Sequence, residues 1–236
     1  MKKVLFEWIL REEKYMIWKF DENKKFDYEN GFYLTSEPYR LGNIIAHYEL
    51  YKKIINLPGD IVELGVFRGG SIIQFATFRE LLENEKSRKI VGFDVFGEFP
   101  NTKEFKSDKE FAENWNKKFS DEVLLKEDLY KSLNYKGIQN IELIQGDIRE
   151  TIDIYLEQNP HTRIAFLHID TDVYEPCKIG LEKLFNRIVP EGLAVFDDYA
   201  TNEGETVAVD EFFKNKDYII KKFPFSHHKP SYLIKK

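Results

Sequence analysis

The stretch Asp60-Ile-Val-Glu-Leu-Gly-Val-Phe-Arg-Gly-Gly-Ser71 joins a short apolar run to a glycine-rich turn. The run over 60–66 follows Pro58-Gly59, and its length and β-branched residues predict a buried strand. The glycines then lead into a segment that extends to about Leu82 and carries apolar residues at helical spacing. The stretch therefore predicts a strand, a tight turn and a helix.

Apolar runs and helical segments alternate along the rest of the chain. Further strands are predicted at 89–94, 141–145, 164–169 and 193–196, and further helices at 40–57, 123–136, 149–158, 176–188 and 205–214. Strands separated by helices of this length predict an α/β fold, with a mostly parallel sheet and helices on both faces. The segments 217–223 and 231–235 are expected to pair antiparallel.

The main domain is expected to carry an extension and an insertion. Residues 1–39 mix aromatic and charged side chains without a clean period, which favours an N-terminal arm or cap on a domain at 40–236. Residues 97–122 form a long connection, and long connections in compact domains are commonly lids or binding loops. We therefore expect a substrate-side insertion at 97–122.

Composition excludes several functional classes. The 236 residues are 42% hydrophobic with a formal net charge of −6, which favours a soluble globular domain and argues against a nucleic-acid partner. Cys177 is the one cysteine, so an intrachain disulfide and a cysteine-based metal site are excluded and a cytoplasmic location is the default. Charged residues interrupt the first apolar residues, so no membrane insertion is expected.

Acidic residues lie at or near the end of each of the five predicted parallel strands. They are Glu63, Asp94, Asp147, Asp170 with Asp172, and Asp197 with Asp198. Ligands of such sheets bind beyond the carboxyl ends of the strands, so these acids mark the expected site. The first turn departs from the Gly-x-Gly-x-x-Gly and P-loop patterns, although its small residues let a ligand approach the backbone. Asp94 is placed to accept hydrogen bonds from ribose hydroxyls. The alternative is that it caps a helix.

Asp170, Asp197 and Asp198 are expected to converge if the fourth and fifth strands are neighbours. Three carboxylates at such short separations repel one another and raise one another's pKa, so the arrangement calls for a cation. Oxygen ligands favour Mg²⁺, or else Mn²⁺. The alternative interpretation is that these acids are solvated helix caps. His168 lies within an apolar strand and is expected to be a core histidine.

The sequence resembles the macrocin O-methyltransferase family of class I S-adenosylmethionine-dependent O-methyltransferases, which methylate sugars. The resemblance extends from about Arg40 to Phe213. It rests on Pro58-Gly-Asp-Ile-Val-Glu-Leu-Gly-Val-Phe-Arg-Gly-Gly-Ser71, Ile169-Asp-Thr-Asp-Val-Tyr-Glu175, Pro190-Glu-Gly192, Asp197-Asp-Tyr199 and Ala208-Val-Asp-Glu-Phe212. It implies a Rossmann-like seven-stranded sheet whose last strand is antiparallel.

The resemblance also implies roles for the strand-end residues. The residues expected to contact the methyl donor are Glu63, Gly65, Arg68, Gly69, Gly70, Ser71, Asp94, Gly146, Asp147 and Asp170. The acids that match the family's Mg²⁺ ligands are Asp170, Asp197 and Asp198, and Asp172 matches the proposed general base. A bound cation lowers the pKa of a sugar hydroxyl, and two vicinal hydroxyls can chelate it.

The expected reaction is therefore Mg²⁺-dependent methylation of a sugar hydroxyl, on a nucleotide-linked, surface-glycan or natural-product sugar. The enzyme is expected to be a homo-oligomer. A catechol is the close alternative acceptor, because it also offers two adjacent oxygens. A nicotinamide-dependent oxidoreductase and a noncatalytic nucleoside-binding module are weaker alternatives. The first lacks its glycine motif and leaves the three acids unexplained. In the second the acids would only cap helices, and no metal dependence is expected.

Overall fold

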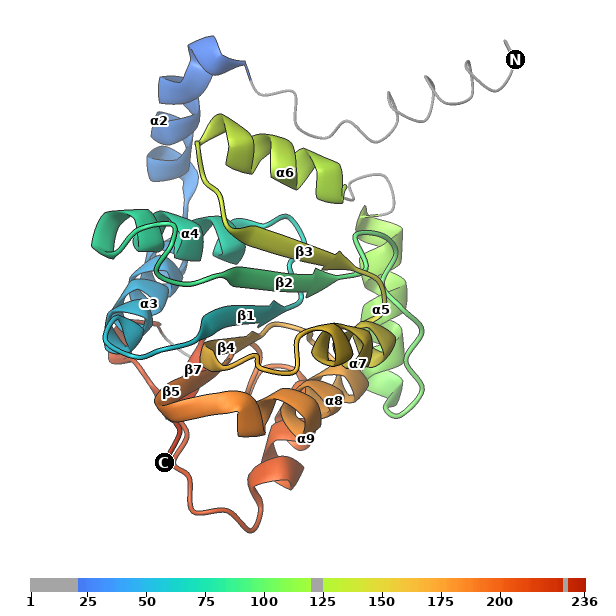
Figure 1. Cartoon of the computed structure of the whole chain (residues 1–236). Coiled ribbons are helices and arrows are strands. Elements are labelled where there is room, and N and C mark those ends of the chain that lie inside the picture. Colours follow the sequence, from blue (N-terminus) through green and yellow to red (C-terminus); the bar gives the residue numbers. More distant parts are fainter. Residues whose placement is uncertain (1–20, 120–124, 227–228) are drawn as a thin grey trace, which may run out of the picture.

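A seven-stranded sheet runs through the computed structural model, which describes residues 21–119, 125–226 and 229–236 (Figure 1). Its strand order is β3-β2-β1-β4-β5-β7-β6. The strands are β1 Asp60–Leu64, β2 Ile90–Asp94, β3 Ile141–Gln145, β4 Ile164–Ile169, β5 Ile188–Phe196, β6 Lys221–Lys222 and β7 Ser231–Ile234. Strands β1 to β5 are parallel, and β7 pairs antiparallel with both β5 and β6. The predicted fold class, including the antiparallel last strand, is confirmed.

The strand order places the reversal of the sheet between β1 and β4. From β1 the chain moves outward to β2 and β3, then returns to the other side of β1 as β4 and continues to β5. The loops that follow β1 and β4 therefore lead away from each other, toward opposite edges of the sheet. Sheets of this class leave room for a ligand between two such loops.

Helices cover both faces of the sheet (Figure 1). One face packs against α3 (Pro38–Ile54), α4 (Gly70–Leu82) and α6 (Lys126–Tyr135), and the other against α7 (Ile148–Gln158), α8 (Tyr174–Leu184) and α9 (Glu203–Phe213). Successive strand residues point to opposite faces. Thus Val62 and Leu64 pack toward α7 and α8, while Ile61 packs toward α3 and α4. Burial on both faces explains why the strands are apolar throughout.

The start of β5 differs from the prediction. The helix expected at 176–188 begins earlier and ends as α8 at Leu184, followed by a 3-10 turn, η2 (Phe185–Arg187). The tripeptide Pro190-Glu-Gly192, expected to precede the fifth strand, lies inside β5. The register against β4 shifts between Ile164 and Phe166, and Glu191 adopts a φ of 65° there. A bulge thus accommodates a proline within the strand.

The remaining described elements belong to the extension, the insertion and the chain's end. The 3-10 turn η1 (Glu22–Lys24) and α2 (Lys25–Thr35) come from the extension, and α2 has no buried residue. Helix α5 (Lys106–Phe119) lies in the insertion, and η3 (Pro224–Ser226) precedes the last strand. The aromatic residues at 1–20 fall outside the described residues. Among the helices described, none is long and apolar enough to cross a membrane.

Candidate functional site

A cavity of about 280 Å³ lies at the carboxyl ends of the parallel strands. The loops after all five parallel strands contribute to its wall. The predicted site residues among its lining are Gly65, Asp94, Asp147, Asp170, Asp172 and Asp198. Those outside the lining are Glu63, Arg68, Gly69, Gly70, Ser71, Gly146 and Asp197. The structure thus gathers acids from four strand ends around one space.

The turn after β1 lies directly against the end of β4. Gly65 has a φ of 87°, and a Cβ atom built there would lie 1.8 Å from the carbonyl oxygen of Asp170. Gly69 caps α4 with a φ of 77°, and a Cβ atom there would lie 2.5 Å from Leu129. Side chains at either position would therefore clash or strain the backbone. By contrast, Gly70 has open space around its α-carbon.

The side chain of Glu63 lies on the face of the sheet that α3 and α4 cover. Its side chain is fully buried, with Oε1 accepting a hydrogen bond from Ser71 Oγ and lying 3.0 Å from His168 Nδ1. Burial raises the pKa of Glu63, although the contacts with His168 and Ser71 oppose that rise. Glu63 and Ser71, two of the residues assigned to the methyl donor, are thus hydrogen-bonded to each other.

Asp94 ends β2 and braces the turn after β1. Its Oδ2 accepts the backbone N–H groups of Val66 and Phe67, each at 2.8 Å, and its Oδ1 accepts that of Phe96 at 2.6 Å. A carboxylate offers about four acceptor positions, so these three bonds use most of its capacity. Asp94 therefore lines the cavity while holding two of its loops in place.

Asp147 is the N-cap of α7 and forms an ion pair that the sequence did not predict. It accepts the N–H of Arg149 at 2.9 Å, and the guanidinium of Arg149 contacts both carboxylate oxygens. Burial alone would raise the pKa of Asp147, but the hydrogen bonds and charge of Arg149 lower it. Arg149 also donates to Glu175 at 2.6 Å. Gly146, at a φ of 136°, donates its N–H to the carbonyl of Asp94 at 2.9 Å.

Asp170, Asp172 and Asp198 form a carboxylate cluster at the ends of β4 and β5, in which Asp198 is buried and the other two are half-buried. One oxygen of each lies within 4.8 Å of the others. Burial and the neighbouring acids raise the pKa of Asp170 and of Asp172 well above their ordinary value. Asp198 Oδ2 is buried without a hydrogen-bond partner among the described residues. The cluster has more acceptors than donors, and it brings Asp172, rather than the expected Asp197, together with Asp170 and Asp198.

Two neighbours partly compensate the carboxylate cluster. Asn202 Nδ2 donates to Asp172 Oδ1 at 2.9 Å. The Lys229 ammonium contacts Asp198 Oδ1 and lies 3.7 Å from Asp197 Oδ2. Burial alone would lower the pKa of Lys229, but the charges of Asp198, Asp197 and Asp170 raise it. No sequence pattern pointed to Lys229 or Asn202.

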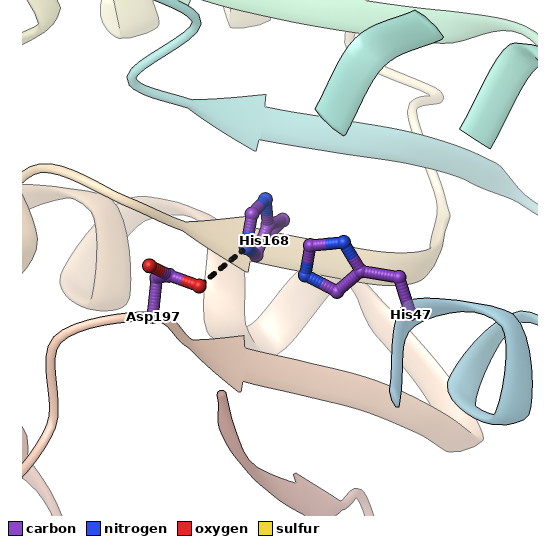
Figure 2. Close-up of side chains that lie close together, drawn as sticks. All are labelled: His47, His168 and Asp197. Carbon is purple, nitrogen blue, oxygen red and sulfur yellow. Dashed lines mark ion pairs between the residues drawn. The ribbon is translucent and has the colours of Figure 1, made fainter. Parts of the chain in front are cut away.

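Asp197 differs from its neighbour Asp198 because its Oδ1 points away from the carboxylate cluster. This atom lies 4.0 Å from His168 Nε2 (Figure 2). It also accepts a hydrogen bond from Asn43 Nδ2 at 3.5 Å. His168 is fully buried, as predicted, and the contacts with Glu63 and Asp197 raise its pKa although burial opposes this. His47, from α3, joins the same group. Burial, followed by the charge of His168, lowers the pKa of His47 to about 4.

Aromatic side chains form the wall of the cavity on the insertion side. Phe67 follows β1 and packs edge-on against Trp115 of α5, with ring centroids 4.8 Å apart. The side-chain amide of Asn116 fixes Phe99 by accepting its N–H at 2.7 Å and donating to its carbonyl at 3.0 Å. Arg68 lies with its guanidinium 5.1 Å from the centroid of Phe67. The insertion therefore shapes the cavity, and Arg68 contacts the aromatic wall.

Comparison with known proteins agrees with this geometry. The profile of the family described as macrocin O-methyltransferase (TylF) matches residues 40–223. A curated relative, 8-demethyl-8-(2,3-dimethoxy-α-L-rhamnosyl)-tetracenomycin-C 4'-O-methyltransferase of Streptomyces olivaceus, is 29% identical over 150 residues, which are 61% of this chain and 54% of the relative. The chain thus spans about half the length of that relative.

Two solved structures share the fold. CalS11, described as a TDP-rhamnose 3'-O-methyltransferase of calicheamicin biosynthesis, is 26% identical with a TM-score of 0.66, covering 92% of this chain and 87% of CalS11. The O-methyltransferase NovP has a TM-score of 0.72 at 21% identity, covering 83% of this chain and 80% of NovP, which is a likeness of fold alone. The predicted resemblance is confirmed, because the family profile spans most of the chain. The protein belongs to the macrocin O-methyltransferase family.

Proposed function

We propose that the protein transfers the methyl group of S-adenosylmethionine to a hydroxyl of a sugar that carries vicinal hydroxyls, with Mg²⁺ bound at the site. The observation that carries this proposal is the carboxylate cluster of Asp170, Asp172 and Asp198, which lines the same cavity as the glycine turn. Such a cavity can hold a donor at one end and a cation with an acceptor at the other.

The β1 to β3 side of the cavity suits the methyl donor. Gly65 brings backbone rather than side chain to the cavity. Asp94 and Asp147 add carboxylate oxygens at the next two strand ends, where ribose hydroxyls and the adenine end would lie. The aromatic wall formed by Phe67, Phe99 and Trp115 supplies apolar surface for a planar base.

The β4 and β5 side fits a divalent cation. Its donors are carboxylate oxygens, which Mg²⁺ prefers, and Asp198 Oδ2 is buried with no partner in the described ranges. The Lys229 ammonium already lies between Asp197 and Asp198, where the acids require positive charge. Asp170, Asp198 and the Oδ2 atom of Asp197 are the proposed ligands. When bound, Mg²⁺ would lower the pKa of the acceptor hydroxyl.

Asp172 is the proposed general base. It lines the cavity, and the hydrogen bond from Asn202 Nδ2 fixes its Oδ1. Its φ of 62° lies in the left-handed region, which aspartate tolerates better than most residues. Asp172 takes the hydroxyl proton as the oxygen attacks the methyl carbon, and the C–S bond of the sulfonium breaks in line. The aromatic wall and the loops exclude water and hold the two reactants together.

A sugar acceptor is supported by the relatives. The Streptomyces olivaceus enzyme is described as acting on a rhamnosyl group, and CalS11 as acting on TDP-rhamnose. A catechol is the second candidate, because it also offers two adjacent oxygens to a cation bound at the carboxylate cluster. A homo-oligomeric state, a cytoplasmic location and the absence of a nucleic-acid partner remain predictions.

An acceptor screen tests the proposal. The purified protein is incubated with methyl-labelled S-adenosylmethionine and either TDP-rhamnose or catechol, in Mg²⁺ or in EDTA. We expect label in the sugar product in Mg²⁺ and not in EDTA. Label in catechol alone would favour the second candidate. No transfer to any vicinal diol, together with no binding of S-adenosylhomocysteine, would contradict methyl transfer.

A further inference from the structure

We propose that His47, His168 and Asp197 form a second metal site, which takes a divalent transition-metal ion such as Zn²⁺ or Co²⁺. His47 comes from α3, His168 from β4, and Asp197 follows β5, so three separate elements meet there (Figure 2). One ligand atom from each lies within 4.8 Å of the others. This inference goes beyond the proposed methyl transfer.

Each of the two histidines has a hydrogen-bond partner at Nδ1, as metal-ligating histidines usually do. His168 Nδ1 lies 3.0 Å from Glu63 Oε1, and His47 Nδ1 lies 2.9 Å from Gln74 Oε1. Each partner atom is an oxygen acceptor, so each Nδ1 carries the hydrogen and each Nε2 is left for a ligand. A carboxylate or carbonyl on the far nitrogen fixes the tautomer and the orientation of a ligating ring.

The two Nε2 atoms have no other use in the fold. His47 is 2% exposed and His168 is fully buried, and neither Nε2 has a hydrogen-bond partner among the described residues. Their rings lie 5.1 Å apart, and His168 Nε2 lies 4.0 Å from Asp197 Oδ1. A proton on His168 would satisfy that nitrogen and Asp197, but it would leave His47 Nε2 without a partner. A metal ion accounts for all three groups.

The donor set distinguishes this site from the adjacent carboxylate cluster. Imidazole nitrogen suits zinc, iron, nickel and copper, whereas Mg²⁺ prefers oxygen alone. Asp197 presents Oδ1 to His168 and Oδ2 toward Lys229, so the two sites use different oxygens of one side chain. The ligand atoms must draw together, because zinc lies about 2.0–2.1 Å from each nitrogen. A bound ion would join α3 to the ends of β4 and β5.

Cobalt titration tests the proposal. The full-length protein is freed of metal with EDTA, the EDTA is removed, and Co²⁺ binding is followed by visible absorption, with Zn²⁺ as competitor. The variants are His47→Leu, which removes a ligand, and Gln74→Leu, which removes only the acceptor behind it. Asp170→Asn is the matched control, since it alters the carboxylate cluster and keeps all three ligands.

The titration is run in excess Mg²⁺, which would fill the carboxylate cluster, and there we expect the wild type and Asp170→Asn each to bind one Co²⁺ that Zn²⁺ displaces. Affinity should be lost in His47→Leu and fall about 10–100-fold in Gln74→Leu. Gln74 is half-buried on α4, so its variant gives a result even if His47→Leu fails to fold. Equal affinity in the wild type and Gln74→Leu, or loss confined to Asp170→Asn, would overturn the proposal.

Discussion

The acids at the two ends of the cavity differ in how they are compensated. On the β2 and β3 side, Asp94 accepts three backbone N–H groups and Asp147 is paired with Arg149, which lowers its pKa. On the β4 and β5 side, burial and mutual repulsion raise the pKa of Asp170 and Asp172. The first pair stabilises the loops, whereas the second destabilises the fold unless a cation binds.

This difference shows that a strand-end acid has no fixed role. Position at the carboxyl end of a strand brings each acid to the cavity, but its donors decide what it does there. An acid that accepts hydrogen bonds from several N–H groups holds the loops around it in place. An acid surrounded by other acids requires a cation or a proton, which makes it suitable for catalysis.

The largest expected effect comes from Asp172→Asn. Asparagine also tolerates the positive φ of residue 172 and can still accept the bond from Asn202. Loss of the base should therefore lower kcat about 10²–10⁴-fold with little change in S-adenosylhomocysteine affinity. Steady-state kinetics measures kcat, and calorimetry measures the affinity for S-adenosylhomocysteine. An unchanged kcat would remove Asp172 from the chemistry.

A second prediction concerns Asp94, on the compensated side. Asp94→Ala leaves the N–H groups of Val66, Phe67 and Phe96 without their acceptor, so the free energy of unfolding should fall by about 1–3 kcal/mol. Urea unfolding measures this. Asp94→Asn, which keeps one oxygen, is the control and should lose less. A variant as stable as the wild type would show that Asp94 does not brace the turn.

The third prediction is the opposite behaviour of Asp170. Its pKa is raised in the folded state, so the folded chain binds more protons than the unfolded one. The free energy of unfolding from this group therefore falls as pH rises from about 4 through the folded pKa. In EDTA, Asp170→Asn should raise Tm relative to the wild type at pH 8, and the gap should close toward pH 4.

Calorimetric scans at several pH values measure that gap. The lowered pKa of His47 makes a contribution of the opposite sign, with stability lost as pH falls from about 6.5 toward 4, but it is common to both proteins and cancels in the difference. A gap that does not change with pH would mean that folding does not raise the pKa of Asp170.

The smallest expected effect is that of Lys229→Met. The ammonium of Lys229 contacts Asp198 and must give way to a cation there. Removing it should tighten Mg²⁺ binding a few-fold, as measured by calorimetry. Lys229→Arg, which keeps the charge, is the control. Weaker Mg²⁺ binding in the methionine variant would show that Lys229 assists the cation rather than competing with it.

The sequence predicted the sheet well because buried parallel strands are apolar throughout. It also predicted the strand-end acids, because they lie where those apolar runs end. It did not predict how those acids are grouped. Asp197 and Asp198 are adjacent in the chain, yet Asp197 is grouped with His47 and His168, whereas Asp198 is grouped with Asp170 and Asp172. His47 lies on a helix whose apolar spacing indicates packing alone. Its approach to His168 depends on how α3 lies on the sheet.

The measurement that tests the central claim most directly is calorimetric titration of the wild type and Asp198→Asn with S-adenosylhomocysteine and then with Mg²⁺, using NAD⁺ as a control ligand. Asp198 belongs to the carboxylate cluster and not to the proposed histidine site. We predict that both proteins bind S-adenosylhomocysteine, that neither binds NAD⁺, and that the wild type alone binds Mg²⁺. Equal Mg²⁺ binding by the variant, or no binding of S-adenosylhomocysteine by the wild type, would contradict the account.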